Sequence, residues 1–186
     1  MSRKKAKFIS VTKDLHIKTQ KFLDERQRLQ LKGYTFYSID ETSFGRHGKP
    51  VMGYSMKGTP LKIIKKQPRM TSVSSLVLIS EKEVVNQCMS TKPFNTIKFL
   101  EFLKSCNFKP NSVLLLDNVS FHHSHVVKQF AADKNLPPYS PWYNPIEGVF
   151  SIIKRHFYKT GNIEESFAMV NAKHIEAFFK DSWKIV

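Results

Sequence analysis

The chain has 186 residues, of which 41% are hydrophobic and 24% are charged. This composition is ordinary for a globular protein and excludes a wholly disordered chain. Thirty Lys and Arg residues against fifteen Asp and Glu residues give a formal net charge of +15. We therefore expect the protein to be attracted to polyanions such as nucleic acid or an anionic membrane surface.

The distribution of apolar residues argues against a secretory signal peptide and against a membrane-spanning segment. No apolar stretch follows the basic residues at positions 3–7, so the N-terminus is not typical of a secretory signal. No run approaches the roughly 20 apolar residues that a membrane span needs. We expect an intracellular protein with no membrane association, located in the nucleus of a eukaryotic host or otherwise in the cytoplasm or nucleoid.

Residues 1–33 predict a basic helical arm. They carry ten Lys and Arg residues against three acidic residues and contain no proline. Leu15, Phe22 and Leu29 recur every seven residues, which favours a helix over 12–31 that Gly33 ends. Two interpretations remain open: the helix packs on the main body with a solvated basic face, or it contacts DNA directly.

The chain changes character at Tyr34, where a strand-rich region begins. Residues 34–40 are β-branched and aromatic and predict a strand that ends in the carboxylate Asp40. Further segments typical of strands are 51–56, 61–65, 71–80 and 83–89.

Basic residues alone supply the charge between Glu41 and Glu81. A stretch in which all charged residues are positive favours a surface that faces phosphates. With Lys154 and Arg155 from a later helix, the predicted DNA-binding residues are Arg46, Lys49, Lys57, Lys62, Lys65, Lys66, Arg69, Lys154 and Arg155.

The second half alternates helices with a strand. A helix is predicted over 95–106, with Ile97, Leu100 and Leu103 on its apolar stripe, followed by a buried strand over 112–117 and a helix over 122–134. A proline-rich turn then leads into a helix from about Ile146, capped by Asn144. This order predicts an α/β fold in which helices flank both faces of a mixed sheet.

Three carboxylates lie at element ends. Asp40 and Asp117 each end a predicted strand, and Glu147 lies in the first turn of a predicted helix. Ligands of open α/β sheets bind at the carboxyl ends of strands. Three such charges in one cleft would need compensation, which two Mg²⁺ or Mn²⁺ ions can provide while serving phosphoryl transfer. Each residue also has a structural interpretation, as a surface turn, a helix cap or a partner of a helix dipole.

The segments around these acids resemble a known family. They read SIDETSF at 38–44, LLLDNVSFH at 114–122 and LPPYSPWYNPIE at 136–147. Together they closely resemble the catalytic domain of the mariner-type DDE transposases and their bacterial insertion-sequence relatives, over about 34–157. The resemblance implies a ribonuclease-H-like fold, with Asp40, Asp117 and Glu147 as the metal-binding triad. It also implies cleavage of double-stranded DNA at transposon ends, joining of the freed 3′-hydroxyl to target DNA, and a homodimer in the DNA complex.

The chain departs from this family in two places. Only 29 residues separate Asp117 from Glu147, fewer than in such relatives, which predicts that a short edge strand between Lys134 and Leu136 is deleted. Only about 33 residues precede Tyr34, where the family carries a helix-turn-helix region. We expect this DNA-binding part to be separate or missing, in a catalytic half, a truncated copy or one product of a split gene.

Four neighbours of the triad are predicted to support it: Glu41, Asn118, His122 and Asn144. His122, His123 and His125 also invite a zinc interpretation, but none has a partner cysteine. Our prediction is a basic helical arm at 1–33, a catalytic domain at 34–160 and a C-terminal helical extension at 161–186 packed on the same domain.

Three functions follow from this pattern. The first is a metal-dependent DNA endonuclease and strand transferase. The second is an inactive, truncated or domesticated transposase remnant that only binds DNA. The third, weaker, is a ribonuclease-H-like nuclease that acts on RNA–DNA hybrids.

Overall fold

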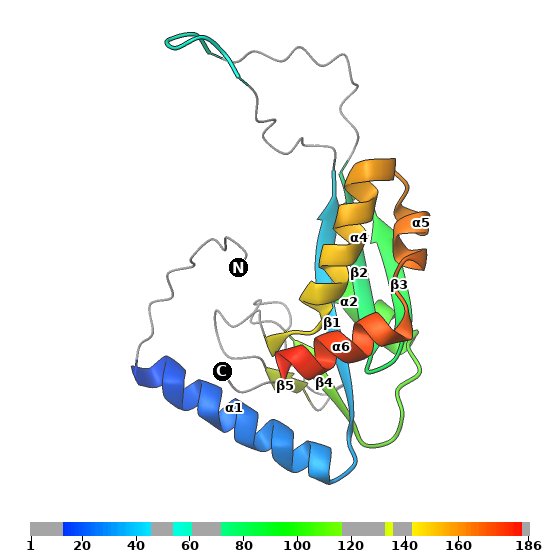
Figure 1. Cartoon of the computed structure of the whole chain (residues 1–186). Helices are drawn as coiled ribbons and strands as arrows, with labels where there is room; N and C mark the ends of the chain where they lie inside the picture. The colour runs from blue at the N-terminus through cyan, green and yellow to red at the C-terminus, as the bar shows by residue number, and fades with distance from the viewer. Residues whose placement is uncertain (1–12, 46–53, 61–71, 117–132, 136–142, 184–186) are drawn as a thin grey trace.

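The structure is a computed structural model that describes residues 13–45, 54–60, 72–116, 133–135 and 143–183 (Figure 1). The predicted strand at 61–65 and the predicted helix up to residue 132 lie outside these ranges.

The described strands form a five-stranded mixed sheet in the order β3-β2-β1-β4-β5. β1 pairs antiparallel with β2 and parallel with β4, and β5 pairs parallel with β4. The bounds are β1 (Thr35–Phe44), β2 (Val73–Ser80), β3 (Val84–Ser90), β4 (Ser112–Leu116) and β5 (Asp133–Asn135). The predicted mixed sheet is therefore confirmed.

Helices cover both faces of this sheet (Figure 1). α4 (Ile146–Thr160), α5 (Ile163–Ala168) and α6 (Ala172–Ser182) pack with alternate strand residues in one core cluster. α2 (Thr96–Lys104) packs with the intervening strand residues in a second cluster. Successive strand residues point to opposite faces, so each central strand supplies both clusters. Among the described residues, no helix combines the length and apolar character that a bilayer span requires.

Periodicity predicts the buried side of α4 correctly and that of α2 only in part. In α4 the predicted stripe is buried: Ile146, Val149, Phe150, Ile153 and Phe157. α2 begins where Asn95 accepts a hydrogen bond from the backbone N of Lys98 at 3.0 Å. Its predicted stripe is partly wrong, because Ile97 is 67% exposed while Phe99 and Leu103 face the sheet.

Two segments differ from the predicted elements. Tyr54–Met56 is not a strand, because Ser55 and Thr59 form side-chain hydrogen bonds of a turn in which Gly58 has a φ of +88°. The edge strand predicted to be deleted is present as β5, and it contains Asp133 and Lys134, which were predicted to be helical. Pairing with the edge of β4 satisfies the backbone of these residues and overrides their local helical pattern.

The N-terminal helix α1 (Lys13–Leu31) packs on the body of the molecule. Leu23 and Leu29 are each only 5% exposed, and Leu29 belongs to the core cluster under α4 and α6. After the helix, Gly33 has a φ of +74°, the left-handed conformation that glycine adopts most easily. The described part of the helix thus packs on the main body, which was one of the two interpretations. Contact between its basic face and DNA stays a prediction.

Arg26 anchors α1 to the end of α6. Its side chain is 7% exposed, and its Nη2 donates to the backbone O of Trp183 at 3.1 Å. The guanidinium carbon lies 5.4 Å from the centroid of the Trp183 ring. Burial lowers the pKa of Arg26, and its Nε and Nη1 have no hydrogen-bond partner among the described residues.

We expect Arg26→Met to keep or raise the free energy of unfolding, by up to about 1 kcal/mol. Methionine retains the packing volume and removes a desolvated cation, two of whose nitrogens have no hydrogen-bond partner among the described residues. The loss of the hydrogen bond to Trp183 and of the cation–π contact opposes this gain. Denaturant unfolding of both proteins measures the difference, and a clear loss of stability would show that the ring contact dominates.

Candidate active site

Asp40 lies in the middle of β1 rather than at its end. The strand continues to Phe44 because its antiparallel pairing with β2 continues as far as the pair Phe44 and Val73. The predicted end of this strand at Asp40 is therefore wrong. The side chain of Asp40 is half-buried, and its Oδ1 accepts a hydrogen bond from the backbone N of Glu41 at 2.7 Å.

Glu147 lies in the first turn of α4, as predicted, and its side chain is exposed. The start of this helix differs in one respect from the prediction. Pro145 occupies the N-cap position and no side chain caps the helix, so Asn144 is not its cap. A Cβ on the next residue, Gly148, would overlap the ring of Phe178, so glycine allows α6 to approach the first turn closely.

A buried hydrogen bond joins the start of α4 to β1. The hydroxyl of Ser38 donates to Oδ1 of Asn144, and the two residues are 0% and 4% exposed. Ser38 precedes Asp40 by two residues and shares its face of the sheet, which is the face that α4 covers. Asn144 precedes Glu147 by three residues. The carboxylates of Asp40 and Glu147 therefore lie on β1 and α4, which the hydrogen bond between Ser38 and Asn144 joins.

The third predicted acid, Asp117, lies outside the described residues, as do Asn118 and His122. Its nearest described neighbour is Leu116, the last residue of β4. The parallel pairing of β1 with β4 is described as far as Ser38 and Leu115. Among the described residues, which do not include Asp117, no group of three or more His, Cys, Asp or Glu side chains could hold a metal ion.

Glu41 lies on the opposite face of the sheet from Asp40 and is half-buried. Its backbone N–H, rather than its carboxylate, contacts Asp40. Its predicted support of the triad stays a prediction, as does that of Asn144, whose side chain bonds Ser38.

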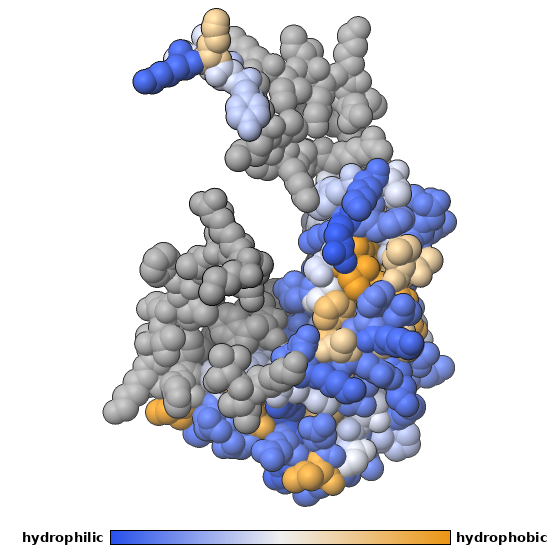
Figure 2. All heavy atoms as spheres, in the orientation of Figure 1, coloured by the Kyte–Doolittle hydropathy of each residue, from blue (hydrophilic) through white to orange (hydrophobic). Residues whose placement is uncertain are grey.

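The predicted DNA-binding residues that the structure describes are accessible to a large ligand. Lys57 and Arg155 are exposed and Lys154 is half-buried. Most described residues on the face shown in Figure 2 are hydrophilic. The remaining candidates lie outside the described residues: Arg46, Lys49, Lys62, Lys65, Lys66 and Arg69.

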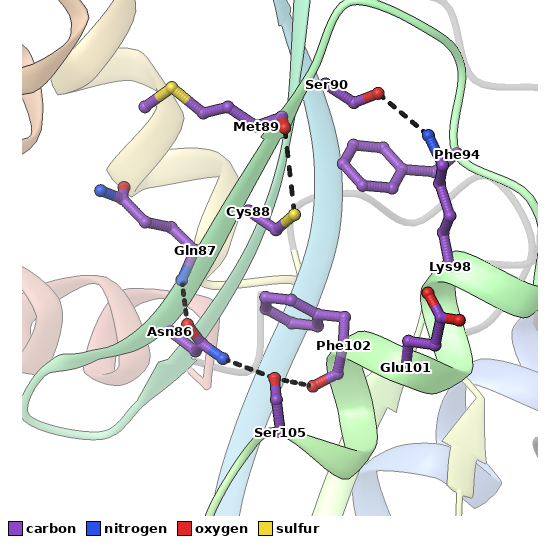
Figure 3. A pocket seen from close by; sticks show the side chains of 10 residues that line it. All are labelled: Asn86, Gln87, Cys88, Met89, Ser90, Phe94, Lys98, Glu101, Phe102 and Ser105. Atoms are coloured by element: carbon purple, nitrogen blue, oxygen red, sulfur yellow. Dashed lines mark hydrogen bonds between the residues drawn. The ribbon is translucent and has the colours of Figure 1, made fainter.

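Two hollows that described residues line flank β3. One lies between β3 and α2 and is lined by polar and apolar side chains that include Asn86, Cys88 and Phe102 (Figure 3). Beside it, Asn86 donates to Oγ of Ser105 at 3.1 Å, and burial raises the pKa of the Cys106 thiol. A thiol of raised pKa is a poor nucleophile, so the Cys106 thiol is not suited to nucleophilic chemistry. The other lies between β3 and the segment that joins α5 to α6.

Comparison with protein families gives one match over most of the chain. The model of a family described as DDE superfamily endonuclease matches residues 35–180. A comparison with curated protein sequences gives no significant match.

Solved structures of the Mos1 mariner transposase have a similar fold. Its paired-end complex with left transposon end matches with a TM-score of 0.72 and 15% identity, covering 98% of this chain and 65% of that chain. Its paired-end complex with Mn matches with a TM-score of 0.74 and 13% identity, covering 98% and 64%. The crystal structure of its catalytic domain matches with a TM-score of 0.60 and 12% identity, covering 94% and 93%. The fold is therefore the ribonuclease-H-like fold that the sequence predicts.

Proposed function

Because the chain belongs to the DDE superfamily endonucleases, we propose that it is a transposase catalytic domain that cleaves DNA at transposon ends and joins the freed 3′-hydroxyl to target DNA. The observation that carries this proposal is the junction of β1 and α4. Asp40 and Glu147, far apart in the sequence, lie on two elements that the hydrogen bond between Ser38 and Asn144 joins.

Asp40, Asp117 and Glu147 would act together as ligands of divalent metal. The parallel pairing of Ser38 with Leu115, continued by two residues, would bring Asp117 beside Asp40, which supports this assignment. Carboxylate oxygens are the ligands that Mg²⁺ and Mn²⁺ prefer. When bound, two such ions supply a Lewis acid for both the attacking and the leaving oxygen of a phosphodiester. The half-buried Asp40 and the exposed Glu147 fit a site that is closed on the sheet side and open to DNA.

The chain's own contribution is to orient the carboxylates and to hold the DNA. Lys154 and Arg155 follow Glu147 by two helical turns on α4 and would neutralise phosphates beside the cleavage point. We propose that two copies of the chain act together, because two transposon ends must be held in one complex.

A nicking assay on supercoiled plasmid with Mg²⁺ or Mn²⁺ tests this function. The wild-type chain is expected to convert supercoiled into nicked DNA in a reaction that EDTA stops. The triple variant Asp40→Asn, Asp117→Asn, Glu147→Gln is expected to bind the same DNA with similar dependence on salt and not to nick it. Equal nicking by both proteins would refute the assignment of the triad.

The alternative is a remnant that binds DNA without cutting it. The 29 residues between Asp117 and Glu147 favour it, because a small misplacement of α4 would disturb a metal site. In the same assay it predicts salt-sensitive DNA binding by both proteins and nicking by neither.

A further inference from the structure

Ser38 is a polar side chain in an apolar environment. It is 0% exposed in the centre of the sheet, where its strand neighbours are Ile79 of β2 and Leu115 of β4. A buried hydroxyl is unfavourable unless it forms a hydrogen bond. Here that bond is made with Oδ1 of Asn144.

Asn144 is used in an unusual way for its position. Asparagine just before a helix usually caps it, by accepting a hydrogen bond from a backbone N–H of the first turn. In α4 no side chain forms this bond, and the side chain of Asn144 instead accepts from Ser38. Its backbone O accepts a hydrogen bond from the backbone N of Glu147 at 3.3 Å.

These contacts form a short connection from one proposed metal ligand to another. It runs from Asp40 along two residues of β1 to Ser38, across the buried hydrogen bond to Asn144, and through a backbone hydrogen bond to Glu147. We propose that Ser38 and Asn144 are positioning residues that hold Glu147 at the distance from Asp40 that a shared divalent cation requires, an inference that rests on the function proposed above.

The same face of the sheet offers a comparison that separates positioning from packing. Ser75 of β2 is also 0% exposed, and its Oγ has no hydrogen-bond partner among the described residues. It lies opposite Thr42, so it belongs to the same face of the sheet as Ser38 and Asp40. The substitutions Ser38→Ala and Ser75→Ala thus remove the same buried atom from neighbouring strands, and only the first breaks the connection to α4.

The test compares Mn²⁺ binding by wild type, Ser38→Ala and Ser75→Ala. Electron paramagnetic resonance of free Mn²⁺ measures binding without reference to activity, and plasmid nicking is followed over a range of Mn²⁺ concentrations. Residues that orient metal ligands usually change metal affinity by about 10–100-fold when they are replaced. We expect a loss of that size for Ser38→Ala, with nicking that recovers at high Mn²⁺, and little change for Ser75→Ala.

Further variants keep the test decisive. Asn144→Ala removes the acceptor from the other side and is expected to weaken Mn²⁺ binding as Ser38→Ala does. The double variant is expected to lose no more than either single variant, because both remove one interaction. Ser38→Thr keeps the hydroxyl and is expected to retain most of the affinity.

The outcomes distinguish this inference from the function on which it rests. Wild type that neither binds Mn²⁺ nor nicks DNA overturns the proposed function, and the inference with it. Wild type that binds and nicks, with equal Mn²⁺ affinity in Ser38→Ala and Ser75→Ala, overturns the positioning role alone. A variant that is less stable but binds Mn²⁺ as wild type does also overturns it. If Ser38→Ala does not fold, a folded Asn144→Ala variant with unchanged Mn²⁺ affinity overturns the positioning role.

Discussion

Glu147→Gln is expected to reduce metal-dependent nicking by about 100-fold or more. Loss of a residue that only orients a metal ligand costs about 10–100-fold, so loss of a ligand carboxylate is expected to cost at least as much. The fold should change little, because the side chain is exposed and its interaction with the helix dipole contributes about 1 kcal/mol or less. Nicking rates at fixed Mg²⁺ measure the first effect and thermal unfolding measures the second.

Glu164→Gln provides the matched control. Glu164 is also exposed and lies in the first turn of a helix, α5, so its substitution removes the same charge from the same kind of position. We expect a similar small change in stability and an unchanged nicking rate. If the two variants nick DNA equally well, Glu147 has no role in the chemistry.

Phe44→Ala is expected to lower the free energy of unfolding by about 3–5 kcal/mol, which is the usual cost of truncating a buried phenylalanine. The side chain is 2% exposed at the end of β1. Its ring centroid lies 5.2 Å from that of Phe157 on α4 and 6.2 Å from that of Phe167 on α5. The truncation would therefore leave a cavity between the sheet and both helices. Urea unfolding of the two proteins measures the loss.

Ile97→Ala is the control for this prediction. Ile97 is 67% exposed on α2, so its truncation removes apolar atoms without opening a cavity. We expect a change within about 0.5 kcal/mol. A comparable loss in both variants would mean that the Phe44 ring does not hold α4 and α5 against the sheet.

The two variants also separate chemistry from architecture. Glu147→Gln is expected to reduce nicking strongly in a folded protein, whereas Phe44→Ala weakens the fold that holds α4. At temperatures where Phe44→Ala remains folded, we expect it to nick DNA, because Phe44 contacts neither Asp40 nor Glu147 in the described contacts.

Much of the fold can be predicted from local patterns. Alternation and apolar runs predict β2 and β4, and the spacing of Ile146, Val149 and Ile153 predicts the buried side of α4. The placement of Glu147 in a first turn follows from the same spacing and from Pro145. These features depend on residues that lie close together in the chain, so periodicity is sufficient to find them.

The sequence could also have directed attention to Ser38, which was not among the predicted site residues. It is a polar residue within an apolar strand, two positions before Asp40, and so needs a partner. The identity of that partner could not be predicted, because Asn144 is 106 residues away and its local context favours a helix cap.

What the sequence determines by itself is the chemistry: the excess of positive charge, the three carboxylates and the motifs that resemble the DDE transposases. What only the tertiary structure decides is where backbone and side-chain partners are found. Pairing with β2 extends β1 beyond Asp40, pairing with β4 makes a strand of residues 133–135, and packing of Leu29 joins α1 to the core. Each of these outcomes depends on a contact between residues distant in the chain, whose free energy exceeds the local preference that the sequence reveals.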